Sequence, residues 1–261
     1  MNLSVNGKQA FVATGGRDFD ASEPTVVLIH GSGSDHSAWA LHSRYFAHHG
    51  ASVLVPDLPG HGRSVGPALA TIAEMADWIA AMLAAVDSRR AHLIGHSMGS
   101  LVAIETAARH PDKVTALGLI GTSDAMTVGA DLLKAAEAND QAAIDMVSIW
   151  GLGFSAELGG SLAPGLWMHG GAQRVLQRCA EGVLFSDLSA CNTYANALAA
   201  AAKVTVPTTA ILGERDMMTP ARAGKKLAAA IPHARTVVLA GAGHMLMSER
   251  PDQLLAALTS R

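Results

Sequence analysis

Short runs of apolar residues recur along the chain, and most of them lack the alternation of apolar and polar positions that a half-exposed strand shows. We predict strands buried on both faces at these runs, which are 25–30, 52–56, 92–95, 116–120, 209–213 and 236–239. Two more short runs, 3–5 and 9–14, flank Asn6-Gly7. This pair favours a hairpin turn, because both residues tolerate a positive φ.

Apolar residues at helical spacing separate most of these runs. Ile72, Ala76, Ile79 and Leu83 recur with this period, and a second helix is predicted to end at His110-Pro111. A final amphipathic helix is predicted around 254–258. Strand and helix alternating after an N-terminal hairpin predict an α/β fold whose mostly parallel sheet is covered on both faces.

The alternation breaks between residues 122 and 203. This stretch has little strand character and carries glycine-rich joints between apolar residues. We expect a helical lid, or cap, over 122–203 that is inserted into a core domain formed by 1–121 and 204–261.

The composition of the chain excludes several classes of protein. The chain has 261 residues, a formal net charge of -3, 49% hydrophobic residues and only 16% charged ones. This excludes a disordered chain, and no run of Lys and Arg is present to bind nucleic acid. Cys179 and Cys191 form neither a disulfide framework nor a zinc spacing, so we expect two reduced buried thiols, no metal and no cofactor.

The sequence also bears on location and partners. No apolar run approaches the ~18–20 residues needed to span a bilayer, and no signal peptide is visible at the N-terminus. We expect a cytoplasmic protein that acts on a small molecule and has no membrane or nucleic-acid partner. The pattern leaves a monomer and a homodimer open.

The sharpest chemical signal is Gly95-His96-Ser97-Met98-Gly99, which lies between a predicted strand and a predicted helix. Gly-x-Ser-x-Gly in this context is typical of a nucleophile elbow, where a strained turn exposes the serine hydroxyl above a sheet. The two glycines relieve crowding on either side of the turn. We therefore predict that Ser97 is a nucleophile.

A serine hydroxyl needs a base, and the base needs an orienting carboxylate. His244 lies in a glycine-flanked loop after the last predicted strand, and Asp216 follows the strand before it. A parallel sheet brings both to the edge that carries Ser97. Glu214 and Asp124 remain alternative carboxylates at this stage.

An acyl-transfer site also needs N–H donors for an oxyanion. Met98 supplies one backbone N–H, and we assign the other to Ser32 in His30-Gly31-Ser32-Gly33-Ser34. The side chains of Ser32, Ser34 and His36 are weaker candidates for substrate contact. His30 is expected to stabilise this loop by hydrogen bonding.

Five motifs together resemble the α/β-hydrolase superfamily. They are His30-Gly31-Ser32-Gly33, Asp57-Leu58-Pro59-Gly60-His61-Gly62-Arg63-Ser64, Gly95-His96-Ser97-Met98-Gly99, Gly213-Glu214-Arg215-Asp216 and Gly243-His244. The resemblance implies an eight-stranded, mostly parallel sheet flanked by helices, with one antiparallel strand near its start and a helical lid after the sixth strand. It also implies that 57–64 is a structural loop beside the site.

The resemblance implies a serine hydrolase like the lidded carboxylesterases. Apolar residues of the lid, together with methionines near the catalytic segments, favour small-to-medium, mainly hydrophobic carboxylic esters cleaved through an acyl-enzyme. Arg174 and Arg178 are the lid cations that could bind a carboxylated substrate. The residues expected to bind substrate are Gly31, Trp150, Trp167, Met217 and Met245.

Alternatives stay open. The same triad serves carbon–carbon bond hydrolases of ring-cleavage products, and perhydrolase activity is a further side reaction of an acyl-enzyme. A ligand receptor on the same fold is a non-catalytic alternative. Serine at position 97 excludes the relatives with an aspartate nucleophile, namely haloalkane dehalogenases and epoxide hydrolases.

Overall fold

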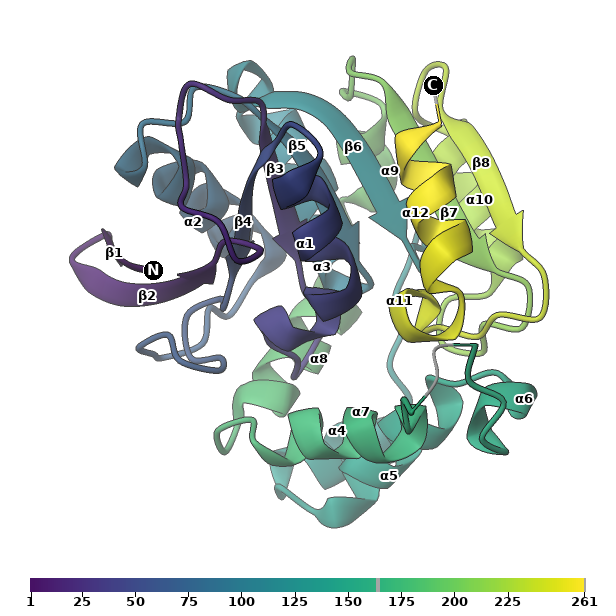
Figure 1. Ribbon diagram of the computed structural model, residues 1–261. Coiled ribbons are helices and arrows are strands. Elements are labelled where there is room, and N and C mark those ends of the chain that lie inside the picture. Colours follow the sequence, from purple (N-terminus) through teal and green to yellow (C-terminus); the bar gives the residue numbers. More distant parts are fainter. Residues whose placement is uncertain (163–164, 261) are drawn as a thin grey trace.

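The computed structural model describes residues 1–162 and 165–260, and its centre is one twisted sheet (Figure 1). The eight strands run in the order β1-β2-β4-β3-β5-β6-β7-β8. Their bounds are Asn2–Val5 (β1), Lys8–Ala13 (β2), Thr25–Ile29 (β3), Ser52–Pro56 (β4), Ala91–His96 (β5), Val114–Ile120 (β6), Thr208–Gly213 (β7) and Arg235–Leu239 (β8). The predicted eight-stranded, mostly parallel sheet is confirmed.

Only β2 runs against the rest of the sheet. It pairs antiparallel with β1 and with β4, whereas every pairing from β4 to β8 is parallel. The hairpin turn at Asn6-Gly7 has φ values of 51° and 77°, as the sequence predicts. The antiparallel strand implied by the resemblance is therefore β2.

The register of the parallel strands aligns their carboxyl ends. Ile29 pairs with Gly95, and His96 pairs with Ile120, which in turn pairs with Ile211. The chain segments that follow β3, β5, β6, β7 and β8 consequently emerge at one edge of the sheet. Ligand sites of open parallel sheets form at this edge.

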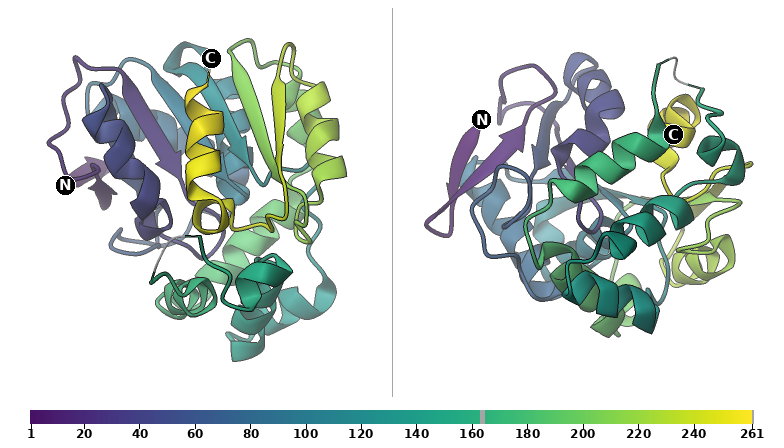
Figure 2. Two further views of the ribbon diagram at one scale, coloured as in Figure 1. Left: turned by 45° about the vertical axis from the view of Figure 1, so that its right-hand side comes forward. Right: turned by 90° about the horizontal axis from the view of Figure 1, so that it is seen from below.

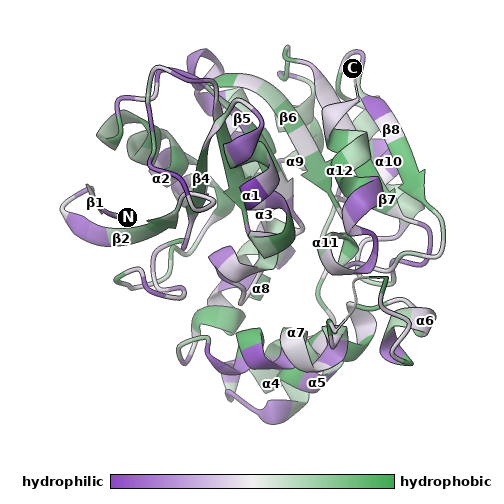
Figure 3. Cartoon of the chain, viewed as in Figure 1, coloured by the Kyte–Doolittle hydropathy of each residue, from purple (hydrophilic) through white to green (hydrophobic). Residues whose placement is uncertain are grey.

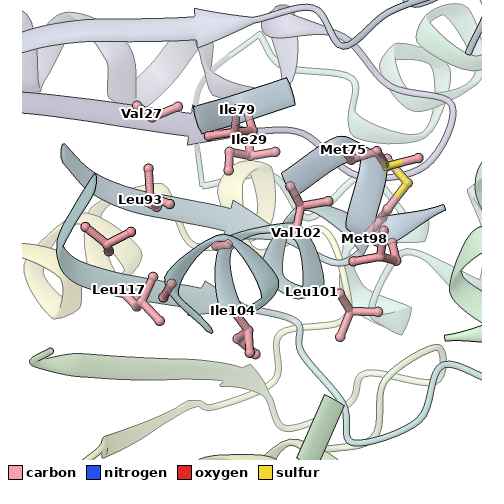
Figure 4. Close-up of a cluster of buried hydrophobic side chains, with 14 of the residues drawn as sticks. Val27, Ile29, Met75, Ile79, Leu93, Met98, Leu101, Val102, Ile104 and Leu117 are labelled. Atoms are coloured by element: carbon pink, nitrogen blue, oxygen red, sulfur yellow. The ribbon is translucent and has the colours of Figure 1, made fainter. Parts of the chain in front are cut away.

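Helices cover both faces of the sheet. Cores on the two sides contain residues of α2, α3 and α10 on one face, and of α1, α11 and α12 on the other. Figure 4 shows the first core, in which Ile79 of α2 and Val102 of α3 pack near Ile29 and Leu93. The helix bounds are Ala40–His48 (α1), Ile72–Ala85 (α2), Met98–Arg109 (α3), Ala221–Ala229 (α10), Leu246–Glu249 (α11) and Pro251–Thr259 (α12), with short 3-10 helices at His36–Trp39 and Pro111–Lys113.

Local signals explain where the main helices begin and end. Thr71 and Glu74 form a reciprocal capping box at the start of α2, which satisfies N–H groups that the helix itself leaves free. Helix α3 ends at Arg109, two residues before Pro111, because proline cannot continue the hydrogen-bond pattern. In Figure 3 the strands β3 and β4 are strongly hydrophobic, as expected of strands covered on both faces.

In the region between β6 and β7 that we call the insertion (residues 122–203), the described residues form six helices. They are Ala130–Glu137 (α4), Gln141–Trp150 (α5), Phe154–Glu157 (α6), Met168–Gln177 (α7), Val183–Thr193 (α8) and Ala197–Ala201 (α9). Seen from below, α4, α5 and α7 lie across one end of the sheet (Figure 2). Residues of α4, α5, α7 and α8 share a small core of their own, whereas α9 joins the core beside α3.

No helix within residues 1–162 and 165–260 combines the length and apolar character that crossing a bilayer requires.

Candidate active site

Ser97 occupies the turn between β5 and α3 with φ 53° and ψ -120°. A side chain at Gly95 would collide with the carbonyl of Gly99, and one at Gly99 would lie 2.5 Å from the carbonyl oxygen of Ile29. The N–H of Ser97 donates to the carbonyl of Ile120 at 2.9 Å, which ties the turn to β6. Both glycines are therefore required by close backbone packing around a strained serine.

His244 and Asp216 meet at the edge of the sheet that also carries Ser97. Nδ1 of His244 lies 2.8 Å from Oδ2 of Asp216, and both residues are buried. The N–H groups of Met218 and Thr219 donate to Oδ1 of Asp216, and the Thr219 hydroxyl donates to its Oδ2. Burial alone would raise the pKa of Asp216, but the charge and hydrogen bond of His244 and the bonds from Thr219 outweigh it, so the pKa is lowered.

The other ring nitrogen of His244, Nε2, is buried and makes no hydrogen bond to the described residues, Ser97 included. Ser97 and His244 line the same cavity. Because the carboxylate of Asp216 accepts a hydrogen bond from Nδ1–H, the neutral form of the imidazole presents an unprotonated Nε2 toward the site.

The two alternative carboxylates have other partners. Oε2 of Glu214 accepts the N–H of Gly241 at 2.9 Å, and Asp124 pairs with Lys226 at 2.5 Å. Asp216 is the carboxylate bonded to His244.

The loop after β3 approaches Ser97 closely. A Cβ on Gly31 would lie 3.2 Å from Cβ of Ser97, and the N–H of Ser34 donates to the Gly31 carbonyl to close a turn. Within the described residues the N–H of Ser32 has no acceptor. The N–H of Met98, at the first position of α3, has no carbonyl partner within its own helix. Two backbone donors are thus available beside Ser97.

The cavity over Ser97 has a volume of about 230 Å³ and apolar walls. The expected residues Gly31, Trp150, Met217 and Met245 line it. Trp167 does not, because its side chain is 71% exposed and its ring lies against Gly170. The other lining residues are Ser32, Ser34, Ala38, His96, Ser97, Met126, Thr127, Val128, Gly129, Leu132, Val147, Leu184, Leu188, Cys191, Met218, Thr219, His244 and Met247.

Charge is scarce around this cavity. Its described lining includes no Lys, Arg, Asp or Glu, so an ionised group inside it would lack a partner of opposite charge. Arg178 pairs with Asp35 instead, and Arg174 donates to Gln177. The pKa of the lining thiol Cys191 is raised to about 12 by burial, which keeps that side chain neutral.

Sequence reasoning missed three contributors to the site. His96 donates from Nε2 to the carbonyl of His244 at 2.9 Å, and burial with the neighbouring His244 lowers its pKa to about 3. Thr219 bonds to Asp216, and Cys191 lines the cavity from α8. Only Thr219 has a local signal, because it lies three residues after Asp216.

His30 links the loop after β3 to the loop after β4 by hydrogen bonds. His30 donates from Nδ1 to the Gly31 carbonyl at 2.8 Å and accepts the N–H of Leu58 at Nε2. Burial lowers the pKa of His30 to about 4, so this neutral tautomer is the stable one. The structure thus confirms that His30 stabilises the loop by hydrogen bonding.

Asp35, His36 and Asp57 form the one group of possible metal ligands found in the described residues, with ligand atoms within 4.8 Å of one another. The carboxylate oxygens of both aspartates already accept hydrogen bonds or form an ion pair. Oδ1 of Asp57 accepts from the backbone N–H and Nδ1 of His36, and its Oδ2 accepts the N–H of Arg63. Asp35 caps a short helix and pairs with Arg178. This arrangement fits a structural network of hydrogen bonds better than a cation site.

Known proteins match this chain over most of its length. A pimeloyl-[acyl-carrier protein] methyl ester esterase of Chromobacterium violaceum is 31% identical over 259 residues, covering 90% of this chain and 92% of that protein. Its counterpart in Neisseria meningitidis is 32% identical over 232 residues, covering 84% of this chain and 85% of that protein.

Solved structures share the architecture. The enol-lactonase of Burkholderia xenovorans superimposes with a TM-score of 0.88 at 24% identity, covering 99% of this chain and 98% of that one. A model of the alpha/beta hydrolase family matches residues 26–258, which span β3 to α12. The chain therefore belongs to the alpha/beta hydrolase family.

Proposed function

We propose that this chain hydrolyses uncharged, small-to-medium, mainly hydrophobic carboxylic esters through an acyl-enzyme on Ser97. The observation that carries the proposal is the state of His244. Its Nδ1 is bonded to Asp216, while its Nε2 has no partner among the residues that the structure describes, and His244 and Ser97 line the same cavity. A base oriented in this way beside a strained serine is the arrangement that nucleophilic catalysis needs.

Acylation would begin when Ser97 Oγ attacks the ester carbonyl and Nε2 of His244 takes the hydroxyl proton. The carbonyl oxygen becomes an oxyanion and accepts hydrogen bonds from the N–H groups of Met98 and Ser32. When the bond to the leaving alcohol breaks, His244 returns the proton to the alcohol oxygen. Ser97 is then esterified with the acyl group.

Deacylation would use the same groups in reverse. Nε2 of His244 removes a proton from water as the water oxygen attacks the acyl carbonyl, and the same two N–H groups hold the oxyanion. The bond to Ser97 Oγ breaks, and Oγ takes the proton back from His244. The carboxylic acid leaves, and the starting state of the site is restored.

Asp216 would act by orientation and charge. It keeps the proton of neutral His244 on Nδ1 and stabilises the imidazolium that forms during each step. Its lowered pKa keeps the carboxylate ionised at neutral pH. Bonds from Thr219 hold the carboxylate in place.

The cavity over Ser97 supports this substrate class. Its apolar walls, rich in methionine, suit an alkyl or aryl group, and its volume of about 230 Å³ limits the size of that group. With no cation in the described lining, an acyl chain that ends in a free carboxylate would be buried without a partner. The names of the relatives, methyl ester esterase and enol-lactonase, also denote cleavage of ester bonds.

The test combines covalent labelling with a graded ester panel. A fluorophosphonate should label the wild type and the exposed-serine control Ser4→Ala, and it should not label Ser97→Ala. Neutral p-nitrophenyl esters should be hydrolysed by the first two proteins alone, and hemiesters with a free carboxylate should react poorly. Full esterase activity in a folded Ser97→Ala protein would refute the nucleophile. Turnover of vinylogous diketones without turnover of any ester would replace ester cleavage by carbon–carbon cleavage.

A further inference from the structure

A buried carboxylate of the insertion reaches the loop that carries the Ser32 amide. Asp187 lies on α8 and is completely buried. Its Oδ2 accepts the backbone N–H of Gly33 at 2.8 Å and the Nε2–H of His61 at 2.8 Å. One oxygen atom therefore joins the insertion, the loop after β3 and the loop after β4.

His61 faces an acceptor at each ring nitrogen. Nε2 donates to Asp187, and Nδ1 lies 3.1 Å from the carbonyl of Pro59. Two acceptors require two protons, which is the imidazolium form. Burial alone would lower the pKa of His61, but the charge of Asp187 and the bonds to Asp187 and Pro59 outweigh it, so the pKa is raised. The pair is thus a buried ion pair.

The turn at residues 31–34, which we call the oxyanion turn, contacts the insertion at Gly33. Gly33 has φ 64°, and a side chain there would lie 2.9 Å from both Leu176 of α7 and Leu184 of α8. The turn is therefore packed directly against the insertion. Because the amide of Gly33 is the next one along from that of Ser32, a shift of the first moves the second.

We propose that Asp187, charged and held by His61, is a positioning residue for the oxyanion turn. It fixes the Ser32 N–H in the place where a developing oxyanion will lie, so that the oxyanion hole is complete only while α8 is docked. This inference rests on the proposed function, because it concerns the transition state of that reaction. The sequence gives Asp187 no motif, and the contact spans 154 positions to Gly33.

The titratable groups around Asp187 and His61 provide no further charge that would replace either member of this ion pair. The ring of His30 lies 4.8 Å from that of His61, and burial together with the charge of His61 keeps His30 neutral. Asp57 is the other carboxylate, besides Asp187, whose charge acts on His30. The thiols of Cys179 and Cys191 face Asp187 and stay neutral, because burial raises the pKa of each to about 12.

Oδ1 of Asp187 is buried without a hydrogen-bond partner among the described residues. The carboxylate is thus held through its other oxygen alone, and loss of the His61 proton would leave a buried negative charge unpaired. Such a charge is strongly destabilising. Deprotonation of His61 is therefore expected to release the turn.

The experiment compares Asp187→Asn with Asp77→Asn. The control breaks a second His–Asp pair, because His110 Nε2 lies 2.7 Å from Asp77 on the surface and away from the site. Active-site titration with a fluorophosphonate first gives the folded fraction of each protein. Steady-state kinetics on a neutral ester and the inhibition constant of a trifluoromethyl ketone, whose adduct with Ser97 carries an oxyanion, are then measured.

For Asp187→Asn we expect kcat to fall about 10- to 100-fold, less than the roughly 10²–10³-fold loss on complete removal of an oxyanion donor. KM should stay within about threefold, since ground-state contacts remain. Affinity for the trifluoromethyl ketone should fall by the same factor as kcat/KM. Asp77→Asn should match the wild type in all three measurements.

A second variant supplies a pH signature. In the wild type, kcat should fall as the pH rises through the raised pKa of His61, while circular dichroism shows a folded protein. His61→Gln has no ring to titrate, so this alkaline fall should be absent and kcat should be moderately reduced at every pH. If Asp187→Asn does not fold, His61→Gln takes its place in the inhibitor comparison.

The outcomes separate the two proposals. If Asp187→Asn, or His61→Gln in its place, melts earlier but binds the trifluoromethyl ketone as tightly as the wild type, Asp187 only docks α8 and the inference is overturned. An alkaline fall in His61→Gln identical to that of the wild type would also overturn it. The proposed function fails independently, if the wild type is not labelled at Ser97 or hydrolyses no ester.

Discussion

The Nδ1 atom of His244 lies 2.8 Å from Oδ2 of Asp216, although 28 positions separate the two residues along the chain. The sheet brings them together, because β7 and β8 are adjacent and parallel and each residue follows the carboxyl end of its strand. A buried carboxylate at this nitrogen fixes the tautomer of the imidazole, which then presents its other nitrogen as a base.

The first prediction concerns this bond. Asp216→Asn should keep the size of the side chain but allow the wrong imidazole tautomer, so kcat on a neutral ester should fall by roughly 10⁴. Labelling of Ser97 by a fluorophosphonate should slow by a similar factor. Stopped-flow labelling together with thermal unfolding distinguishes this loss from unfolding.

Matched controls exist on the same edge of the sheet. Glu214→Gln and Asp124→Asn remove the two nearby carboxylates that bond to Gly241 and Lys226 instead of His244. Both variants should keep kcat within a few-fold of the wild type. If either one loses activity as Asp216→Asn does, the assignment of the orienting carboxylate is wrong.

A second prediction tests the cavity with two tryptophans of the insertion. Trp150 lines the cavity, whereas Trp167 is exposed and lies outside it. Trp150→Ala should raise KM for a bulky hydrophobic ester by roughly fivefold, on the assumption that about 40 Å² of apolar contact worth about 1 kcal/mol is lost. Trp167→Ala should leave KM unchanged. Equal effects of the two changes would show that the wall of the cavity lies elsewhere.

The difference between Trp150 and Trp167 could not be predicted from the sequence, whereas other parts of the site could. The elbow around Ser97 could be predicted because its signal is local, with a strand, two glycines and a helix in one short stretch. The positions of Asp216 and His244 follow from the topology, since parallel strands deliver their carboxyl ends to one edge. Nothing local distinguishes Trp150 from Trp167, because the orientation of each depends on how the insertion packs.

The contacts that complete the site have still weaker signals in the sequence. His61 meets Asp187 across 126 positions, and His96 meets the His244 carbonyl across 148. Each pair forms only when separate elements pack against the same edge of the sheet. Residue type and spacing carry no information on such pairs without the tertiary structure.

A third prediction concerns the glycines of the elbow. Gly99→Ala would place a methyl group 2.5 Å and 2.6 Å from the carbonyl oxygens of Ile29 and His30, so backbone must move. We expect a loss of about 1–3 kcal/mol in the free energy of unfolding, together with loss of Ser97 labelling because the serine shifts. Urea denaturation and fluorophosphonate labelling measure the two effects.

Gly171→Ala is the matched control for this substitution. Gly171 lies in α7 with open space where its Cβ would stand, and alanine favours a helix over glycine by about 1 kcal/mol. This variant should be slightly more stable than the wild type and equally active. A Gly99→Ala protein as stable and as reactive as Gly171→Ala would contradict the close packing described for the elbow.

The fourth prediction concerns Glu249, which holds the loop of His244 against the insertion. Its Oε2 accepts the N–H groups of Gly153 and Gly243 at 3.1 Å and 2.9 Å. Its Oε1 is buried without a partner among the described residues. Burial, opposed only in part by these hydrogen bonds and by Arg250, raises the pKa of Glu249 above its ordinary value of 4.5.

A carboxyl group whose pKa is raised on folding holds its proton more tightly in the folded chain than in the unfolded chain. The contribution of Glu249 to the free energy of unfolding should therefore decrease as the pH rises from 4.5 through its raised pKa. Asp216 and Asp57 have lowered pKa values, so they change the free energy of unfolding only below about pH 3.8. His61 and His36 have raised pKa values and change it only above about pH 6.5. The buried histidines His30, His42, His92 and His96 have pKa values lowered to about 4 or 3, so their contribution to stability increases over the same interval. The contribution of Glu249 is therefore measured as the difference between the wild type and a variant without this carboxyl group.

Glu249→Gln removes this titration but keeps an oxygen acceptor for the two glycine N–H groups. In urea unfolding at a series of pH values above 4.5, the free energy of unfolding of the variant should rise relative to that of the wild type, because only the wild type loses the contribution of Glu249. Glu157→Gln, a change at an exposed glutamate of α6, should run parallel to the wild type. If Glu249→Gln also runs parallel, Glu249 ionises at the same pH in the folded and unfolded chains, and its burial has been compensated by water or by movement of the loop.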